Sequence, residues 1–294
     1  MRNAQWMTVP KRRGTAVLLA VSLILMWVPP AQARSGVLQT HCRFSHRAQV
    51  DPIVNPGLES THLHDFFGSK TTNANSTYES MVGQPTSCDI AGDSAGYWTP
   101  TLLNQAGVPI PIHRVTVYYR DKPDASTPVV AFPPDFRMIA GYPDPHLVEG
   151  PIKKGAYGWN CDNTEPLLES AAIDCAGHPG DDRVKANIFF PNCGQLDADG
   201  NIVTDSFDHR GHVAYPVDGV CPPDHPVKLP TVYYKIKYSV TNCITAGCHL
   251  ASDELAGTAS GQSLHADLWN TWVQSVLQDV VTRCLNGDNC TFSD

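Results

Sequence analysis

Apolar and polar residues alternate along several short segments of the chain. In the longest, from Val232 to Val240, every second residue is apolar, and Lys235 and Lys237 stand between them. Residues 115–119 show the same alternation. A period of two is typical of a β-strand with one buried face, because successive side chains point to opposite sides. Further short runs predict strands at Val129–Phe132, Phe136–Ala140, Lys185–Phe190 and His212–Tyr215.

Turns rich in proline separate these segments. Phe132-Pro133-Pro134-Asp135 and Tyr142-Pro143-Asp144-Pro145 are two of them, and such clusters are strong turn signals. Many short strands joined by turns are typical of antiparallel sheets that pack face to face. We therefore predict a mainly β protein, folded as an antiparallel β-sandwich or jelly-roll-like domain with long loops.

One segment has a helical period instead. Between Leu268 and Cys284, apolar residues recur at steps of three and four, which places them in one stripe along a helix. We expect Ser263 to cap the start of this helix, and Gly287 follows its end. The pattern predicts a C-terminal amphipathic helix whose tryptophans belong to the core. The apolar residues of the stripe are Trp269, Trp272, Val273, Val276, Val280 and Val281.

The N-terminal segment has the pattern of a cleavable signal peptide. Basic residues are followed by an uninterrupted apolar run, Thr15–Val28, and by the small residues of Ala31-Gln32-Ala33. The run is shorter than the about 20 residues that a membrane-spanning helix needs. We expect a signal peptide over residues 1–33 and a single secreted, extracellular domain over residues 34–294, with no membrane contact after cleavage. An uncleaved anchor is the alternative.

The cysteines all follow this segment, and their number is even. An even count in an exported chain predicts disulfides. Zinc is the alternative, but no C-x-x-C pair occurs. The sequence does not fix the connectivity, and we expect five bridges between neighbours in the sequence. These are Cys42–Cys88, Cys161–Cys175, Cys193–Cys221, Cys243–Cys248 and Cys284–Cys290.

The charge of the chain narrows the classes of partner. The net charge is −8, and all the basic residues of the signal segment would be lost on cleavage. No basic stripe appears anywhere in the sequence. An acidic chain without such a stripe has no electrostatic attraction for a phosphate backbone. Nucleic acid is therefore not an expected partner.

Three clusters of histidine with aspartate are the candidates for a functional site. They are His62-Leu63-His64-Asp65, Asp208-His209-Arg210-Gly211-His212 and His265-Ala266-Asp267. If the first lies on a strand, both of its imidazoles point to the same side. Histidines three apart, as in the second cluster, can share one side of a turn. We predict that the three clusters converge on one site.

Two kinds of chemistry suit these residues. One is a single divalent metal ion, because histidine and carboxylate are common ligands of zinc, copper and iron; the expected ligands are His62, His64, His212 and His265. The other is proton transfer, in which Asp65 or Asp208 pairs with a histidine and Arg210 steadies an anionic group. The candidate catalytic residues are Asp65, Asp208, His209, Arg210 and Asp267. A purely structural network of hydrogen bonds is the remaining interpretation.

Aromatic residues leave a further alternative open. Tyr97-Trp98 and Trp159 lie in turn-like stretches, where flat rings could stack on sugars or could equally fill a sandwich core. Nucleophile elbows, P-loops and dinucleotide fingerprints do not occur in the sequence.

Several ordered motifs resemble one family. They lie between about Cys42 and Cys284, and the chain resembles the domain-of-unknown-function family numbered nineteen ninety-six. It departs from the family pattern at Gly194 and at Leu268, where aromatic residues are common. The motifs are Asp51-Pro52-Ile53-Val54, His62-Leu63-His64-Asp65-Phe66-Phe67-Gly68, Tyr97-Trp98-Thr99-Pro100, Phe190-Pro191-Asn192-Cys193, Asp208-His209-Arg210-Gly211-His212 and His265-Ala266-Asp267 with Trp272.

The resemblance implies a biological setting rather than a reaction. Members of this family are secreted proteins of fungi and bacteria, in fungi sometimes beside carbohydrate-binding modules. We therefore expect an extracellular carbohydrate-active protein that cleaves or modifies a polysaccharide or cell-wall glycan, as a hydrolase or lyase. A non-catalytic glycan-binding module with structural histidines is the alternative.

Overall fold

The computed structural model describes residues 36–121, 127–141, 156–161, 171–258, 260–287 and 289–290. They belong to one compact unit over residues 33–294. The predicted signal peptide lies outside the described residues. Among the described residues, no helix has the length and hydropathy needed to cross a membrane.

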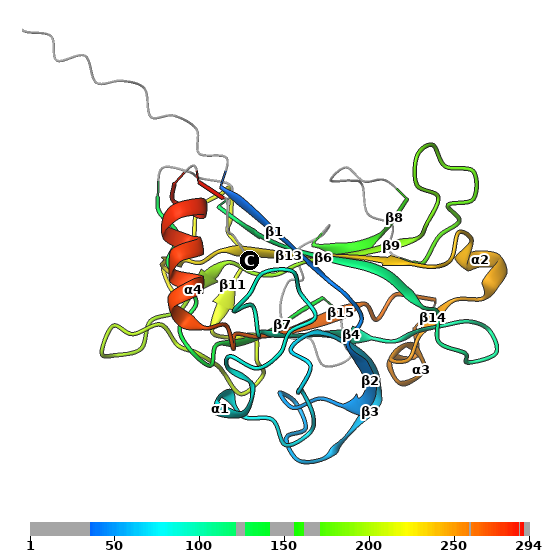
Figure 1. The fold of residues 1–294 in the computed structure, drawn as a ribbon, viewed down its shortest axis with the longest axis horizontal. Coiled ribbons are helices and arrows are strands. Elements are labelled where there is room, and N and C mark those ends of the chain that lie inside the picture. Colours follow the sequence, from blue (N-terminus) through cyan, green and yellow to red (C-terminus); the bar gives the residue numbers. More distant parts are fainter. Residues whose placement is uncertain are drawn as a thin grey trace, which may run out of the picture. The chain divides into compact units, whose positions relative to one another are not determined.

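Two five-stranded antiparallel sheets form the body of this unit (Figure 1). The first has the order β1 (Val37–Cys42), β6 (Ile112–Arg120), β13 (Thr231–Tyr238), β9 (Lys185–Phe189) and β8 (Tyr157–Asn160). The second has the order β2 (His46–Val50), β3 (Glu59–Gly68), β4 (Gly96–Pro100), β15 (His265–Trp269) and β7 (Arg137–Gly141).

Smaller elements complete the described part of the chain. Two short sheets are β11 (Val213–Ala214), β10 (Cys193–Gly194) and β12 (Val227–Lys228), and β14 (His249–Leu250) with β5 (Leu102–Leu103). The helices are α1 (Tyr78–Met81), α2 (Cys243–Ala246), α3 (Asp253–Ala256), α4 (Gln274–Asp279) and the π-helical turn η1 (Val280–Leu285).

The two large sheets share one hydrophobic core. Tyr234 of β13 packs edge-on against Phe67 of β3 and Tyr97 of β4, with ring centroids 5.3 and 5.5 Å apart. All three rings are fully buried, and burying a large apolar side chain contributes about 1.5–3 kcal/mol. The prediction of a mainly β, antiparallel sandwich is confirmed.

Most of the predicted strands are present, and one is wrong. Residues 115–119 lie in β6, and the expected segments near 136, 185, 212 and 232 contain β7, β9, β11 and β13. Val129–Phe132 is not a strand. Its Val129 backbone is held by the side chain of Asn286, which accepts from the N–H at 2.9 Å and donates to the carbonyl at 2.8 Å. A side-chain amide thus replaces a neighbouring strand.

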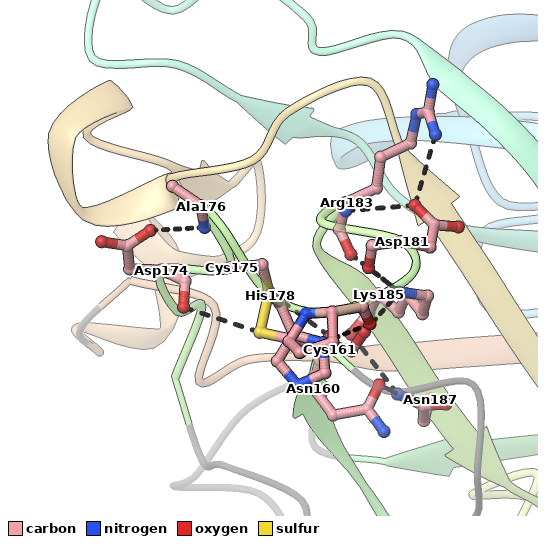
Figure 2. The surroundings of a disulfide bond; sticks show 11 residues. Asn160, Cys161, Asp174, Cys175, Ala176, His178, Asp181, Arg183, Lys185 and Asn187 are labelled. Carbon is pink, nitrogen blue, oxygen red and sulfur yellow. Dashed lines mark hydrogen bonds and ion pairs between the residues drawn. A yellow bond between two sulfur atoms is a disulfide. The ribbon is translucent and has the colours of Figure 1, made fainter.

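All five disulfides join cysteines that are neighbours in the sequence, as predicted. Figure 2 shows the bridge between Cys161 and Cys175 at the end of β8. Beside it, the buried Lys185 ammonium donates to the carbonyl oxygens of Cys161, Asp181 and Arg183 at 2.7–3.2 Å. The bridge and the buried cation together fix this edge of the first sheet.

The C-terminal helix is much shorter than expected and begins later. Residues 265–269 form β15, which pairs on one side with β4 and on the other with β7. The helix starts only at Gln274 and ends as η1 at Leu285. Ser263 is no helix cap, since its hydroxyl donates to Asp253 at 2.6 Å. The alternation in His-Ala-Asp-Leu-Trp, with a partner strand on either side, outweighs the helical spacing that continues through Trp272.

Candidate metal and catalytic site

The candidate site lies on the face of the second sheet that points away from the shared core. In β3, His62, His64 and Phe66 alternate with residues of the core face. Phe66 is next to Trp98 of β4 in register, and Trp98 is next to Asp267 of β15. These large rings form a separate small hydrophobic cluster on the outer face.

Three histidines from two strands converge on this face. The ring centroids are 4.3 Å apart for His62 and His64, 5.2 Å for His62 and His265, and 6.1 Å for His64 and His265. One ring nitrogen from each lies within 4.8 Å of those from the other two. His64 pairs with Pro100 of the intervening strand β4. The first and third clusters thus meet.

Hydrogen bonds fix the protonation of two of these rings. Nδ1 of His64 lies 2.9 Å from the carbonyl oxygen of Val50, and Nδ1 of His265 lies 2.8 Å from that of Ser263. A carbonyl only accepts, so Nδ1 carries the proton and Nε2 keeps its lone pair. Nε2 of His62 and of His64 is buried and has no hydrogen-bond partner among the described residues.

The three imidazoles are held in the neutral form. Burial lowers the pKa of His62 to about 4. It lowers the pKa of His64 and His265 well below the ordinary value, and the closeness of His62 lowers both further. Desolvation disfavours the charged form of a base. At neutral pH these rings therefore offer unprotonated nitrogens, the form that binds a metal.

Two buried aspartates complete the group. One oxygen each of Asp51 and Asp267 and one ring nitrogen of His64 lie within 4.8 Å of one another. Oδ1 of Asp51 accepts from the backbone N–H groups of Ile53 and Val54, both at 3.1 Å. Both carboxylate oxygens of Asp267 are buried and have no hydrogen-bond partner among the described residues.

Burial raises the pKa of both carboxyl groups. The pKa of Asp267 is well above the ordinary value, chiefly from burial and then from the nearby Asp51, while Arg210 opposes the rise. The pKa of Asp51 is raised by burial, and the backbone N–H groups and His209 oppose it. Without a cation, burial shifts both carboxyl groups toward the protonated form. A bound cation would reverse that shift.

Part of the second cluster reaches the edge of this group. The carbonyl of His209 accepts from the N–H of Ile139. Ile139 lies in β7, where it pairs with Asp267 of β15. Nη1 of Arg210 donates to the carbonyl of Gly141 at 3.2 Å, and Gly141 is the residue paired with His265. Nδ1 of His209 itself contacts Asp205 at 2.7 Å. The backbone of His209 and the side chain of Arg210 therefore lie at the rim of the site.

Asp65 does not belong to the site, although the sequence analysis paired it with a histidine. Because strand side chains alternate, it lies on the core side of β3, opposite to His64. One of its oxygens accepts from Nε of Arg47 at 2.6 Å and from the hydroxyl of Thr101 at 3.0 Å. Its role is to neutralise a neighbouring arginine.

Asp208 and His212 also lie outside the group. Asp208 is exposed and accepts from the backbone N–H groups of Arg210 and Gly211 at 3.1 and 2.7 Å, which holds a turn. Nε2 of His212 lies 2.8 Å from the carbonyl of Arg137. That nitrogen therefore carries a proton and is not free to bind a metal. The expectations for these two residues are corrected.

Asp51 is the site residue that the sequence analysis did not select. It appeared only as part of the motif Asp51-Pro52-Ile53-Val54, and no spacing rule connects it with His64 or Asp267. Tyr97, Trp98 and Trp159 are fully buried. These rings therefore fill the interior and are not exposed for stacking on sugars.

Fold and site together define a disulfide-rich β-sandwich with a buried histidine–carboxylate group on one outer face. The family described as "Domain of unknown function (DUF1996)" matches residues 51–272. The chain therefore belongs to that family, as the motifs indicated. The matched segment begins at Asp51 and contains every residue of the group. The curated proteins and the solved structures give no significant match.

Proposed function

We propose that this protein is a secreted, metal-dependent enzyme that cleaves or modifies a polysaccharide. The metal ligands in this proposal are His62, His64 and His265, and the adjacent carboxylates are Asp51 and Asp267. One observation carries it: lone pairs of neutral histidines and both oxygens of Asp267 converge in the interior without partners among the described residues.

The energetic cost of such an arrangement argues for a ligand. A buried polar atom without a hydrogen bond costs about 1–3 kcal/mol, and an uncompensated buried carboxylate costs several. A divalent cation would satisfy the imidazole nitrogens of His62, His64 and His265 and compensate Asp267 at once. The carbonyl groups on Nδ1 of His64 and His265 also match the usual support of metal-bound histidines.

The donor set favours a transition metal. Neutral imidazole suits zinc, copper, iron and nickel, whereas calcium and magnesium prefer oxygen ligands only. When bound, such an ion would supply Lewis acidity and would lower the pKa of a coordinated water.

The chain's own residues divide the remaining tasks. Asp51 is fixed by two backbone N–H groups and acts as a stationary charge. Asp267 has no such anchor among the described residues and is placed to accept and return a proton. Hydrolysis and elimination of a glycosidic bond both need such a group.

Two further features support secretion and a glycan substrate. The described cysteines form five disulfides, and none is free; disulfides of this kind belong to oxidising compartments. The N-terminal segment has the pattern of a signal peptide. The glycan itself comes from the setting of the family, in which members occur beside carbohydrate-binding modules.

Metal analysis run beside a glycan-release screen tests the proposal. Protein purified without chelator should hold about one equivalent of metal, and His64→Ala should lose most of it because water replaces an imidazole ligand poorly. Release from a polysaccharide panel should fall with the metal. His113→Ala, at an exposed histidine of β6, is the matched control and should change neither.

The outcome also separates the proposal from its alternative. A protein that holds no metal and releases nothing, but binds a glycan of the panel equally well with and without His64, would be a non-catalytic binding module. In that case the histidines would be structural.

A further inference from the structure

The candidate site contains a guanidinium, that of Arg210, with which the described residues form no ion pair. Nη2 of Arg210 is buried and has no hydrogen-bond partner among the described residues. Nη1 is bound only to the neutral carbonyl of Gly141. Asp267 and Asp208 both act electrostatically on the guanidinium, but neither forms an ion pair with it within the described part of the chain. A buried guanidinium nitrogen without a partner is costly.

The backbone holds this guanidinium in place. Gly141 has a φ of +84°, and a Cβ there would lie 2.4 Å from the carbonyl oxygen of Leu264. Glycine is therefore required for the close approach that presents its carbonyl to Arg210. On the other side, the N–H of Arg210 is bound by Asp208 at 3.1 Å. The arginine is thus anchored at both ends beside His265.

The guanidinium of Arg210 still has no ion-pair partner among the described residues when the site is loaded. The three histidines are neutral, and the carboxylates of Asp51 and Asp267 would compensate a divalent ion. Asp208 also acts on Arg210, but it accepts from the backbone N–H groups of Arg210 and Gly211. A planar guanidinium recognises carboxylate and sulfate groups with directed N–H bonds.

We propose that the substrate is an acidic glycan whose carboxylate or sulfate group is bound by Arg210 next to the metal. This deepens the proposed function and rests on it. A uronic acid residue would place its carboxylate against the partly exposed guanidinium of Arg210, while the glycosidic bond faces the histidines and Asp267. Neutral glycans would leave the guanidinium uncompensated and bind more weakly.

Binding to the metal-loaded protein tests the substrate class. Isothermal titration with oligogalacturonate and with a sulfated oligosaccharide, each against a neutral oligosaccharide of equal length, separates the two anions. We expect at least one acidic oligosaccharide to bind about 10-fold or more tightly than its neutral counterpart, in keeping with charge-assisted hydrogen bonds. Arg210→Ala should remove the preference and keep the metal, whereas Arg210→Lys should restore part of it.

Arg114→Ala, at an exposed arginine of β6, is the control and should leave the preference unchanged. Equal binding of acidic and neutral oligosaccharides, no binding of either, or a preference that survives Arg210→Ala would each overturn the inference. The metal content is measured on the same samples. A metal-loaded protein that releases neutral glycans without any acidic preference would overturn this inference alone and leave the proposed function standing.

Discussion

Two groups of buried polar side chains lie on opposite faces of the second sheet, and they differ in how far their hydrogen bonds are satisfied. On the core side, the hydroxyl of Tyr97 donates to Asp93 at 2.7 Å and lies 2.8 Å from that of Tyr119. Nε1 of Trp272 donates to the Tyr119 hydroxyl at 2.9 Å. Each ring thus has a partner, and the group acts as a pin between the two sheets.

The group on the outer face has the opposite character. His64 and Asp267 are as inaccessible to water as the inner group, and His62 is partly buried. Nε2 of both histidines and the two oxygens of Asp267 are buried and have no partners among the described residues. Burial alone therefore does not distinguish a functional site from a group that only stabilises the fold of this protein. The number of unsatisfied atoms does: the inner group leaves one oxygen of Asp93 without a partner, whereas the outer group leaves two imidazole nitrogens and both oxygens of Asp267. Without a ligand, the outer group therefore carries the larger cost.

Substitution of Asp267 is expected to have the largest effect on the difference between the two groups. Asp267→Asn should lower glycan release by about 100-fold or more, the scale expected when a proton-transfer group is lost. The same change should raise the thermal stability of the metal-free protein, because a neutral amide replaces an unpaired buried carboxyl group. Kinetics and thermal unfolding on the same preparation measure both. An active Asp267→Asn enzyme would remove Asp267 from the mechanism.

Asp93 of the inner group should make the stability of the protein depend on pH. Burial raises its pKa to about 7 from the ordinary 3.8, so between about pH 4 and pH 7 the folded state keeps a proton that the unfolded state has lost. The free energy of unfolding must then fall as the pH rises through this range, by a few kcal/mol. Asp93→Asn should flatten that part of the profile in urea titrations and leave metal binding unchanged. Parallel profiles for the two proteins would contradict the assignment.

Tyr119 tests whether the inner group is architecture. Tyr119→Phe removes the hydroxyl shared by Tyr97 and Trp272 and should cost about 1–3 kcal/mol of stability, because two buried groups lose a partner. Metal content and glycan release per folded molecule should not change. Loss of metal in this variant would mean that the two faces are coupled.

Asp208 provides the smallest expected effect. It is exposed and holds a turn, so Asp208→Asn, which keeps an oxygen acceptor, should change stability by about 0.5 kcal/mol or less. Activity should stay within about twofold of the wild type, since no proton-transfer role falls to it. A large loss of turnover with an intact fold would restore Asp208 as a catalytic residue.

Local patterns allowed much of the fold to be predicted. Alternation located β6, β9 and β13 of the first sheet and β7 of the second, and proximity in the sequence gave all five disulfides. The pattern His62-Leu63-His64 placed two imidazoles on one face of a strand. The same period, applied one residue further, puts Asp65 on the other face, so its exclusion could have been predicted as well.

The remaining part of the site depends on contacts that no local pattern shows. His265 and Asp267 share a face because residues 265–269 are a strand between two partners, whereas the following apolar residues suggested a helix. Asp51 joins them from a loop through long-range packing. His212 has the same local features as a ligand, and only the carbonyl of Arg137 shows that its Nε2 is occupied.

The central claim is that three imidazoles bind one metal ion, and X-ray absorption spectroscopy of the metal-loaded protein tests it most directly. The account predicts scattering from three histidine nitrogens at about 2.0–2.1 Å for zinc, reduced by one nitrogen in each of His62→Ala, His64→Ala and His265→Ala. An all-oxygen shell, or a histidine count that these substitutions leave unchanged, would contradict it.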